Sequence, residues 1–131
     1  MNVRIFNKNT DYVITEGWWN ERQQTPAPIE FLSDYGVIAF EEEKPICAIW
    51  FYPILSAKFG LIKGPVTNPD TTKEQRSNAL NSSMDVLHII AKDLGYTHVL
   101  CPSNVDAFKD RLKSFGYVEG DKDCIHFWGG L

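Results

Sequence analysis

The chain has 131 residues, of which 44% are hydrophobic and 23% charged, and its formal net charge is -4. This composition predicts one folded domain over residues 1–131 and excludes an intrinsically disordered chain. The longest nearly apolar run, Ile46 to Leu55, is too short to cross a bilayer. No basic segment followed by an apolar run stands at the start, so a secretory leader is not expected. Three cysteines without metal-type spacing favour a reduced, cytoplasmic protein that has neither disulfides nor a bound metal.

The first half of the chain predicts one helix and a series of strands. Thr10 or Asp11 is expected to cap a helix that runs towards Trp19. One or two helical turns are expected at residues 29–32. The charged cluster at 41–45 separates two apolar runs and predicts a hairpin turn. Strands are expected at residues 3–6, 36–40, 46–52 and 58–66, the last of them interrupted by Gly60, Gly64 and Pro65.

The strongest helical pattern lies in the middle of the chain. Thr71 and Glu74 are spaced as a capping box at its start, and Gly95 is expected to end it. Apolar side chains recur between these limits at intervals of three and four residues, which predicts one buried stripe along the helix. The stripe consists of Leu80, Met84, Leu87, Ala91 and Leu94.

A second amphipathic helix is expected near the end of the chain. Ser103 or Asn104 is expected to cap this helix, and Gly116 to end it. Its apolar face consists of Val105, Phe108, Leu112 and Phe115, and further strands are expected at residues 97–101, 117–119 and 124–128. Hairpin strands followed by helical crossovers predict a mixed α/β sheet with helices on both faces.

The segment from Val66 to Tyr117 carries a resemblance to a known family. A long helix ends in Ala-Lys-Asp-Leu-Gly-Tyr at 91–96, a strand then leads to Pro-Ser-Asn at 102–104, and a second helix ends in Leu-Lys-Ser-Phe-Gly-Tyr at 112–117. This order resembles the GCN5-related N-acetyltransferase (GNAT) family. The resemblance implies a mixed, mostly antiparallel sheet that is splayed between its fourth and fifth strands.

The resemblance also implies a site for acetyl-CoA as a co-substrate. The pantetheine arm would lie in the splayed cleft, along the edge of the fourth strand at Ile62, Gly64 and Val66, and Asn104 would help to hold it. Backbone N–H groups at a helix start suit a pyrophosphate, because they are unpaired donors at the positive end of the helix. The positions that correspond to the family's phosphate loop are Gln75, Arg76, Ser77, Asn78 and Ala79.

The sequence departs from the family's pattern at two places. Asn78 and Leu80 stand where the phosphate loop has small residues, and shifting the alignment by one residue brings in no glycine either. Leu112 stands where many members have a tyrosine that protonates the leaving thiolate, and its place on the apolar face indicates a core residue. Cys101 and Ser103, near the mouth of the cleft, are the weak candidates for a catalytic side chain.

Other polar and aromatic side chains have simpler interpretations. The carboxylates at 41–43 are typical of a solvated turn, and His88 is expected to be a partly buried packing residue. Trp18 and Trp19 are adjacent in a helix and cannot share a face, so one of them is free to project towards the acceptor side. The sequence alone does not indicate which residue would act as a general base.

These observations leave two functions of different classes. The first is transfer of an acetyl group from acetyl-CoA to a small-molecule or protein amine acceptor. The alternative is a non-catalytic binding or assembly module that keeps the fold without the cofactor. A nucleic-acid modifier is a third interpretation, but 17 acidic against 13 basic residues argue against duplex DNA as a partner. The sequence leaves the oligomeric state open, with a homodimer as one possibility.

Overall fold

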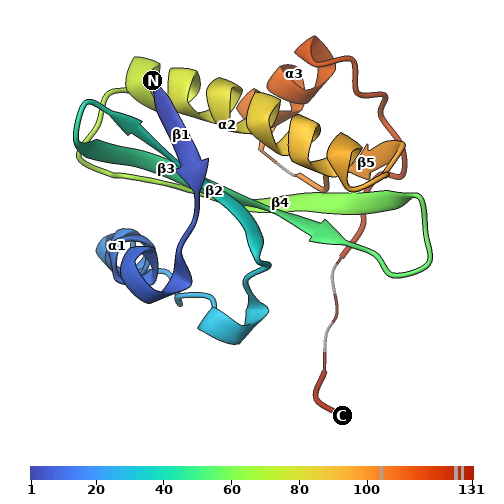
Figure 1. Cartoon of the computed structure of the whole chain (residues 1–131), viewed down its shortest axis with the longest axis horizontal. Coiled ribbons are helices and arrows are strands. Elements are labelled where there is room, and N and C mark those ends of the chain that lie inside the picture. Colours follow the sequence, from blue (N-terminus) through green and yellow to red (C-terminus); the bar gives the residue numbers. More distant parts are fainter. Residues whose placement is uncertain (104, 126, 128) are drawn as a thin grey trace.

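A five-stranded sheet lies between helices in the computed structural model, which describes residues 1–103, 105–125, 127 and 129–131. The strands follow each other in the order β1-β2-β3-β4-β5, and all neighbours are antiparallel except β4 and β5. One helix, α1, covers one face of the sheet, while α2 and α3 cover the other (Figure 1). This confirms the predicted mixed sheet with helices on both faces. The elements are β1 (Asn2–Ile5), α1 (Lys8–Glu21), a 3-10 turn η1 (Ile29–Phe31), β2 (Tyr35–Glu41), β3 (Lys44–Pro53), β4 (Phe59–Thr67), α2 (Lys73–Asp93), β5 (His98–Leu100) and α3 (Asp106–Ser114).

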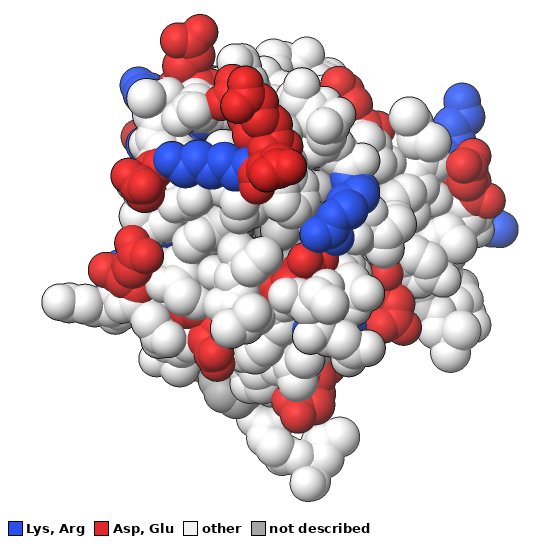
Figure 2. Space-filling model, turned by 60° about the vertical axis from the view of Figure 1, so that its left-hand side comes forward, with Lys and Arg blue, Asp and Glu red and all other residues white. Residues whose placement is uncertain are grey.

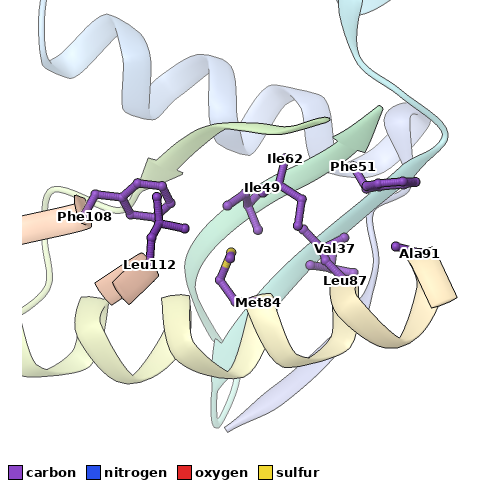
Figure 3. Packing of buried hydrophobic residues seen from close by; sticks show 9 residues of the cluster. All are labelled: Val37, Ile49, Phe51, Ile62, Met84, Leu87, Ala91, Phe108 and Leu112. Atoms are coloured by element: carbon purple, nitrogen blue, oxygen red, sulfur yellow. The ribbon is translucent and has the colours of Figure 1, made fainter. Parts of the chain in front are cut away.

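Each face of the sheet has its own hydrophobic core. Strand β3 is apolar almost throughout because alternate side chains enter opposite cores. Ile49 and Phe51 pack under α2 and α3, whereas Ala48 and Trp50 pack under α1. Figure 3 shows how side chains from α2 and α3 meet those of the sheet. The residues of this core are Val37, Ile49, Phe51, Ile62, Met84, Leu87, Ala91, Phe108 and Leu112.

Both long helices begin at a different cap from the one that the sequence predicts. Asn7 caps α1 by accepting a hydrogen bond from the Asn9 N–H, so Thr10 and Asp11 lie inside the first turn. Thr72 caps α2 in a capping box with Gln75, one residue beyond the predicted Thr71. The Thr71 hydroxyl instead donates to a loop carbonyl. Neighbouring Ser, Thr and Asn side chains cap about equally well, and tertiary contacts therefore decide which one is used.

The C-terminal part of the chain differs most from the prediction. Val105 stands at the N-cap of α3 and its N–H donates to the Ser103 hydroxyl, so the predicted cap at Ser103 is wrong. Residues 117–119, 124, 125 and 127 form no strand in the described part of the chain, while 104, 126 and 128 lie outside it. Two apolar side chains that were expected on buried helix faces, Leu94 and Val105, are exposed. Val118 and Ile125, in the segments expected to be strands, are exposed as well.

A buried carboxylate joins β1 to α1. Both oxygens of Asp11 accept hydrogen bonds from the Arg4 guanidinium, at 2.7 and 2.8 Å, and one oxygen also accepts the Asn7 N–H at 2.8 Å. The hydrogen bond from Arg4 is the main cause that lowers the pKa of Asp11, against the opposing effect of burial. Asp11 therefore serves as an electrostatic link between strand and helix rather than as a helix cap.

Asp11→Asn is expected to lower the free energy of unfolding at pH 7 by about 1.5–3 kcal/mol, since hydrogen bonds to a charged group are lost. A lowered folded-state pKa stabilises the protein above the unfolded pKa, and this stabilisation disappears as the pH falls through the folded value. The difference between wild type and variant should therefore shrink below about pH 4. Urea denaturation at several pH values measures it. Asp34→Asn, which removes an exposed pair with Lys8, is the control and should change stability little. A difference independent of pH would contradict the assignment.

Candidate functional site

The sheet opens between β4 and β5. The two strands pair over only three positions, from Phe59–His98 to Leu61–Leu100, whereas β4 continues to Thr67. In the described residues no strand pairs with this continuing edge of β4. Strand β5 stops at Leu100 because Pro102 follows closely and has no N–H to donate. The structure thus confirms the splay between the fourth and fifth strands.

A bulge lies in β4 beside this opening. Ala48 pairs with Val66 and Trp50 with Lys63, which leaves two residues, Gly64 and Pro65, opposite one. Gly64 has φ +75°, a backbone conformation that residues with a Cβ rarely adopt. The bulge reverses the alternation of β4. Ile62 consequently packs in the core under α2, whereas Val66 packs in the core under α1.

The start of α2 is the second feature beside the opening. The Thr72 hydroxyl accepts the Gln75 N–H at 3.1 Å, and the Gln75 amide oxygen accepts the Thr72 N–H at 2.9 Å. No acceptor in the described residues faces the backbone N–H groups of Lys73 and Glu74. These two groups are therefore the open donors of the helix start.

The predicted phosphate-loop residues lie inside α2 rather than before it. The Arg76 N–H already donates to the Thr72 carbonyl at 3.1 Å, and the Arg76 guanidinium donates to the Thr71 carbonyl. Both the carbonyl and the hydroxyl of Ser77 accept hydrogen bonds from Arg111 of α3. Because α2 already begins at Lys73, its open N–H donors lie before the predicted phosphate-binding segment at 75–79. The binding roles of Gln75, Arg76, Ser77, Asn78 and Ala79 stay predictions, as do those of Ile62, Gly64 and Val66.

Neither of the two candidate catalytic residues, Cys101 and Ser103, has the surroundings that activate a nucleophile. Burial raises the pKa of the Cys101 thiol to about 12, so this thiol keeps its proton at neutral pH. The Ser103 hydroxyl accepts the Val105 N–H at 3.1 Å. Asn104, the predicted pantetheine contact, lies outside the described residues. Leu112 is buried in the same core cluster as Ile62, which confirms its interpretation as a core residue.

Sequence reasoning missed a polar pair between α2 and the residues that follow α3. The Nε2 atom of His88 and the hydroxyl of Tyr117 lie 2.7 Å apart. Burial raises the pKa of Tyr117 above its ordinary value, with a smaller contribution from Cys101, and burial lowers the pKa of His88. Cys101 and Tyr117 both pack against the core that contains Ile62. No spacing rule links residues 29 positions apart; the one available signal was a hydroxyl on the aromatic residue after Gly116.

An aromatic groove of about 560 Å³ lies on the α1 side of the bulge. Trp19, the one of the two adjacent tryptophans that was free to project, lines this groove, while Trp18 is buried. The groove is thus next to the bulge, on the opposite side of the sheet from α2. Its lining residues are Trp19, Thr25, Ala27, Phe31, Leu32, Trp50, Tyr52, Lys63, Gly64 and Pro65.

Charges are mixed on the face of the molecule shown in Figure 2, where no continuous basic area is seen. Among the described residues, no three His, Cys, Asp or Glu side chains are grouped so as to hold a metal ion. None of the helices in this part of the chain has the length and apolar character needed to span a bilayer. Cys47 is buried, with its pKa raised to about 11, Cys101 is half-buried and Cys124 is exposed.

Comparisons with known proteins support the fold. No protein-family model and no curated protein matches this sequence. Wild-type TTHA1254 of Thermus thermophilus superposes with a TM-score of 0.73 at 16% identity over 100% of both chains. Rv2747 of Mycobacterium tuberculosis, solved with CoA and NLQ, gives a TM-score of 0.71 at 15% identity over 96% of this chain and 76% of that chain. The aminoglycoside acetyltransferase meta-AAC0020 from an uncultured soil metagenomic sample, solved with trehalose, gives 0.67 at 12% identity over 99% of this chain and 95% of that chain. The chain therefore has the fold of a known acetyltransferase.

Proposed function

We propose that this chain, acting as one cytoplasmic domain, transfers an acetyl group from acetyl-CoA to an amine. The observation that carries the proposal is the opening between β4 and β5, with an unpaired strand edge and a bulge beside it. An unpaired edge offers backbone donors and acceptors to an extended ligand such as pantetheine. The shared fold with an aminoglycoside acetyltransferase supports the same interpretation.

The pantetheine arm would run along β4 from Val66 towards Ile62, with the thioester near the point where β4 and β5 part. The pyrophosphate would lie near the start of α2, where the N–H groups of Lys73 and Glu74 are open and Arg76 adds positive charge. A helix N-terminus stabilises an anion through its free donors and its dipole. The Glu74 carboxylate opposes this attraction, and Lys73 offsets it.

Tyr117 would be the proton donor in place of the tyrosine that Leu112 replaces. The neutral amine attacks the thioester carbon, the carbon–sulfur bond breaks, and the leaving thiolate takes the hydroxyl proton of Tyr117. Water takes the proton that the new amide nitrogen releases, and solvent returns a proton to Tyr117. Burial disfavours the charged form of a thiol, as it does for Cys101 in the same core, so a leaving thiolate there would gain from protonation. His88 would position the hydroxyl through the 2.7 Å contact.

Thr72→Asp is expected to weaken acetyl-CoA binding by about tenfold or more, since a carboxylate would face the pyrophosphate. Asp caps a helix at least as well as Thr, so α2 should stay intact. Isothermal titration calorimetry measures the affinity, and Thr72→Ser is the matched control that should bind like wild type. Equal binding by Thr72→Asp would place the pyrophosphate elsewhere. If wild type binds no acetyl-CoA at millimolar concentration, the proposed function fails.

One observation favours the non-catalytic alternative. Phe108 and Leu112 of α3 share a core cluster with Ile62, so apolar side chains pack close to where the cleft begins (Figure 3). A module without cofactor would keep this packing, whereas an enzyme has to admit the pantetheine arm beside it. The titration with wild-type protein separates the two functions.

A further inference from the structure

The groove beside the bulge is lined by aromatic side chains and by one charged residue. Trp19 stacks on Trp50, with ring centroids 6.2 Å apart and an angle of 19° between the planes. The Lys63 ammonium lies 5.4 Å from the centre of the Tyr52 ring. Lys63 is part of β4 directly before the bulge, so its charge lies close to where the proposed reaction takes place. The groove therefore combines a large apolar surface with a single positive charge.

The kinds of side chain that line the groove restrict the acceptor. Lys63 is the one charged residue among the ten that line it, and no carboxylate is among them. A polyamine or an aminoglycoside carries several positive charges and would meet the Lys63 ammonium without a counter-charge. An acceptor with a carboxylate would instead gain an ion pair, and its apolar part would cover the aromatic rings.

We propose that the acceptor is an α-amino acid with an aromatic or large aliphatic side chain. Its carboxylate pairs with Lys63, and its side chain packs against Trp19 and Tyr52. This assignment rests on the proposed function, because it concerns the acceptor of the same acetyl transfer. It goes further by naming the substrate class and the residue that selects it.

Lys63 also helps the amine to react. Only the neutral amine has a lone pair for attack on the thioester, and a nearby positive charge favours that neutral form by lowering the amine's pKa. In an α-amino acid the amine and the carboxylate are bonded to one carbon, so a carboxylate held by Lys63 brings the amine next to Gly64 and Pro65. Attack forms the carbon–nitrogen bond, expels the thiolate and releases one proton from nitrogen to water.

A set of three acceptors tests the substrate class. L-Phenylalanine, phenethylamine and spermidine are each incubated with acetyl-CoA and the protein, and the acetylated product is measured by mass spectrometry. Phenethylamine has the same ring and amine without the carboxylate. We expect kcat/KM for L-phenylalanine to exceed that for phenethylamine by about tenfold or more, as an ion pair with hydrogen bonds provides. Faster acetylation of spermidine or phenethylamine would overturn the inference and leave the proposed function standing.

Lys63→Met tests the residue itself, since Met keeps most of the length of the side chain without the charge. The preference for L-phenylalanine over phenethylamine should collapse in Lys63→Met and persist in Lys63→Arg. Lys63 is exposed, so both variants should fold, and thermal melting checks this. Calorimetric titration with N-acetyl-L-phenylalanine, the expected product, measures the affinity of the groove without any turnover. Loss of that binding in Lys63→Met supports the inference, and unchanged binding contradicts it, whether or not acetyl-CoA binds.

Discussion

Gly60→Ala is expected to lower the free energy of unfolding by about 3 kcal/mol, near the upper end of the usual cost of overpacking. An added Cβ would lie 2.3 Å from Cζ of Phe51 and 2.8 Å from the carbonyl oxygen of Tyr52. The Phe51 ring is fully buried, and the Tyr52 carbonyl belongs to the backbone of β3, so neither atom can move away easily. Gly60 also pairs with Val99, and the strain would reach the short ladder that holds β5.

Urea denaturation of wild type, Gly60→Ala and Gly17→Ala checks this prediction. Gly17 lies in α1 with nothing within 4 Å of its ideal Cβ, so it is a matched control. Alanine favours a helix over glycine by about 0.8–1 kcal/mol, and Gly17→Ala should therefore stabilise the protein. The two substitutions add the same methyl group and should act in opposite directions. Equal stability of Gly60→Ala and wild type would mean that β3 and β4 are further apart than the structure has them.

Tyr117→Phe is expected to lower kcat by about 100-fold, because proton transfer by a positioned side chain contributes at least this much in many enzymes. The phenyl ring keeps its packing against the core, and only the hydroxyl that contacts His88 is removed. KM for acetyl-CoA should change little, since the hydroxyl acts when the carbon–sulfur bond breaks. A loss confined to kcat would distinguish a proton donor from a side chain that only supports the fold.

Tyr96→Phe is the matched control, since Tyr96 packs against the same core but its hydroxyl donates to the Ile54 carbonyl at 3.0 Å instead of contacting His88. Its kcat should equal that of wild type. The pH profile gives an independent measure. The pKa of Tyr117 is raised above its ordinary value of 10.0, so wild-type activity should not decline on the alkaline side below that pH through loss of this proton. Unchanged kcat in Tyr117→Phe would exclude this residue as the acid.

Local patterns predicted the helix ends well. Gly95 and Gly116 both have positive φ, 91° and 87°, and the residue after each donates back into the last helical turn. Such an ending depends on one glycine, and its signal is entirely local. The opening between β4 and β5 was also predictable, because the residues near it include prolines that cannot continue a ladder.

Features that depend on tertiary contacts were not predictable in the same way. Strict alternation along a strand would put Ile62 and Val66 on the same side of the sheet, but the bulge places them in different cores. The segment after Gly116 has apolar residues at strand-like spacing, but it lacks a partner among the described residues, and Val118 and Phe127 are exposed. A short strand is stable only when a neighbour pairs with it, and the sequence of one segment does not contain that neighbour.

The three cysteines have a practical consequence for covalent labelling. A maleimide or a disulfide reagent reacts with the thiolate, and the raised pKa values of Cys47 and Cys101 leave almost none of it near neutral pH. Cys124 is exposed, so a dye can be attached at this one position without mutating the others. The same thiol would contribute a signal in any colorimetric assay that follows released CoA. Cys124→Ser removes that background and leaves both cores untouched.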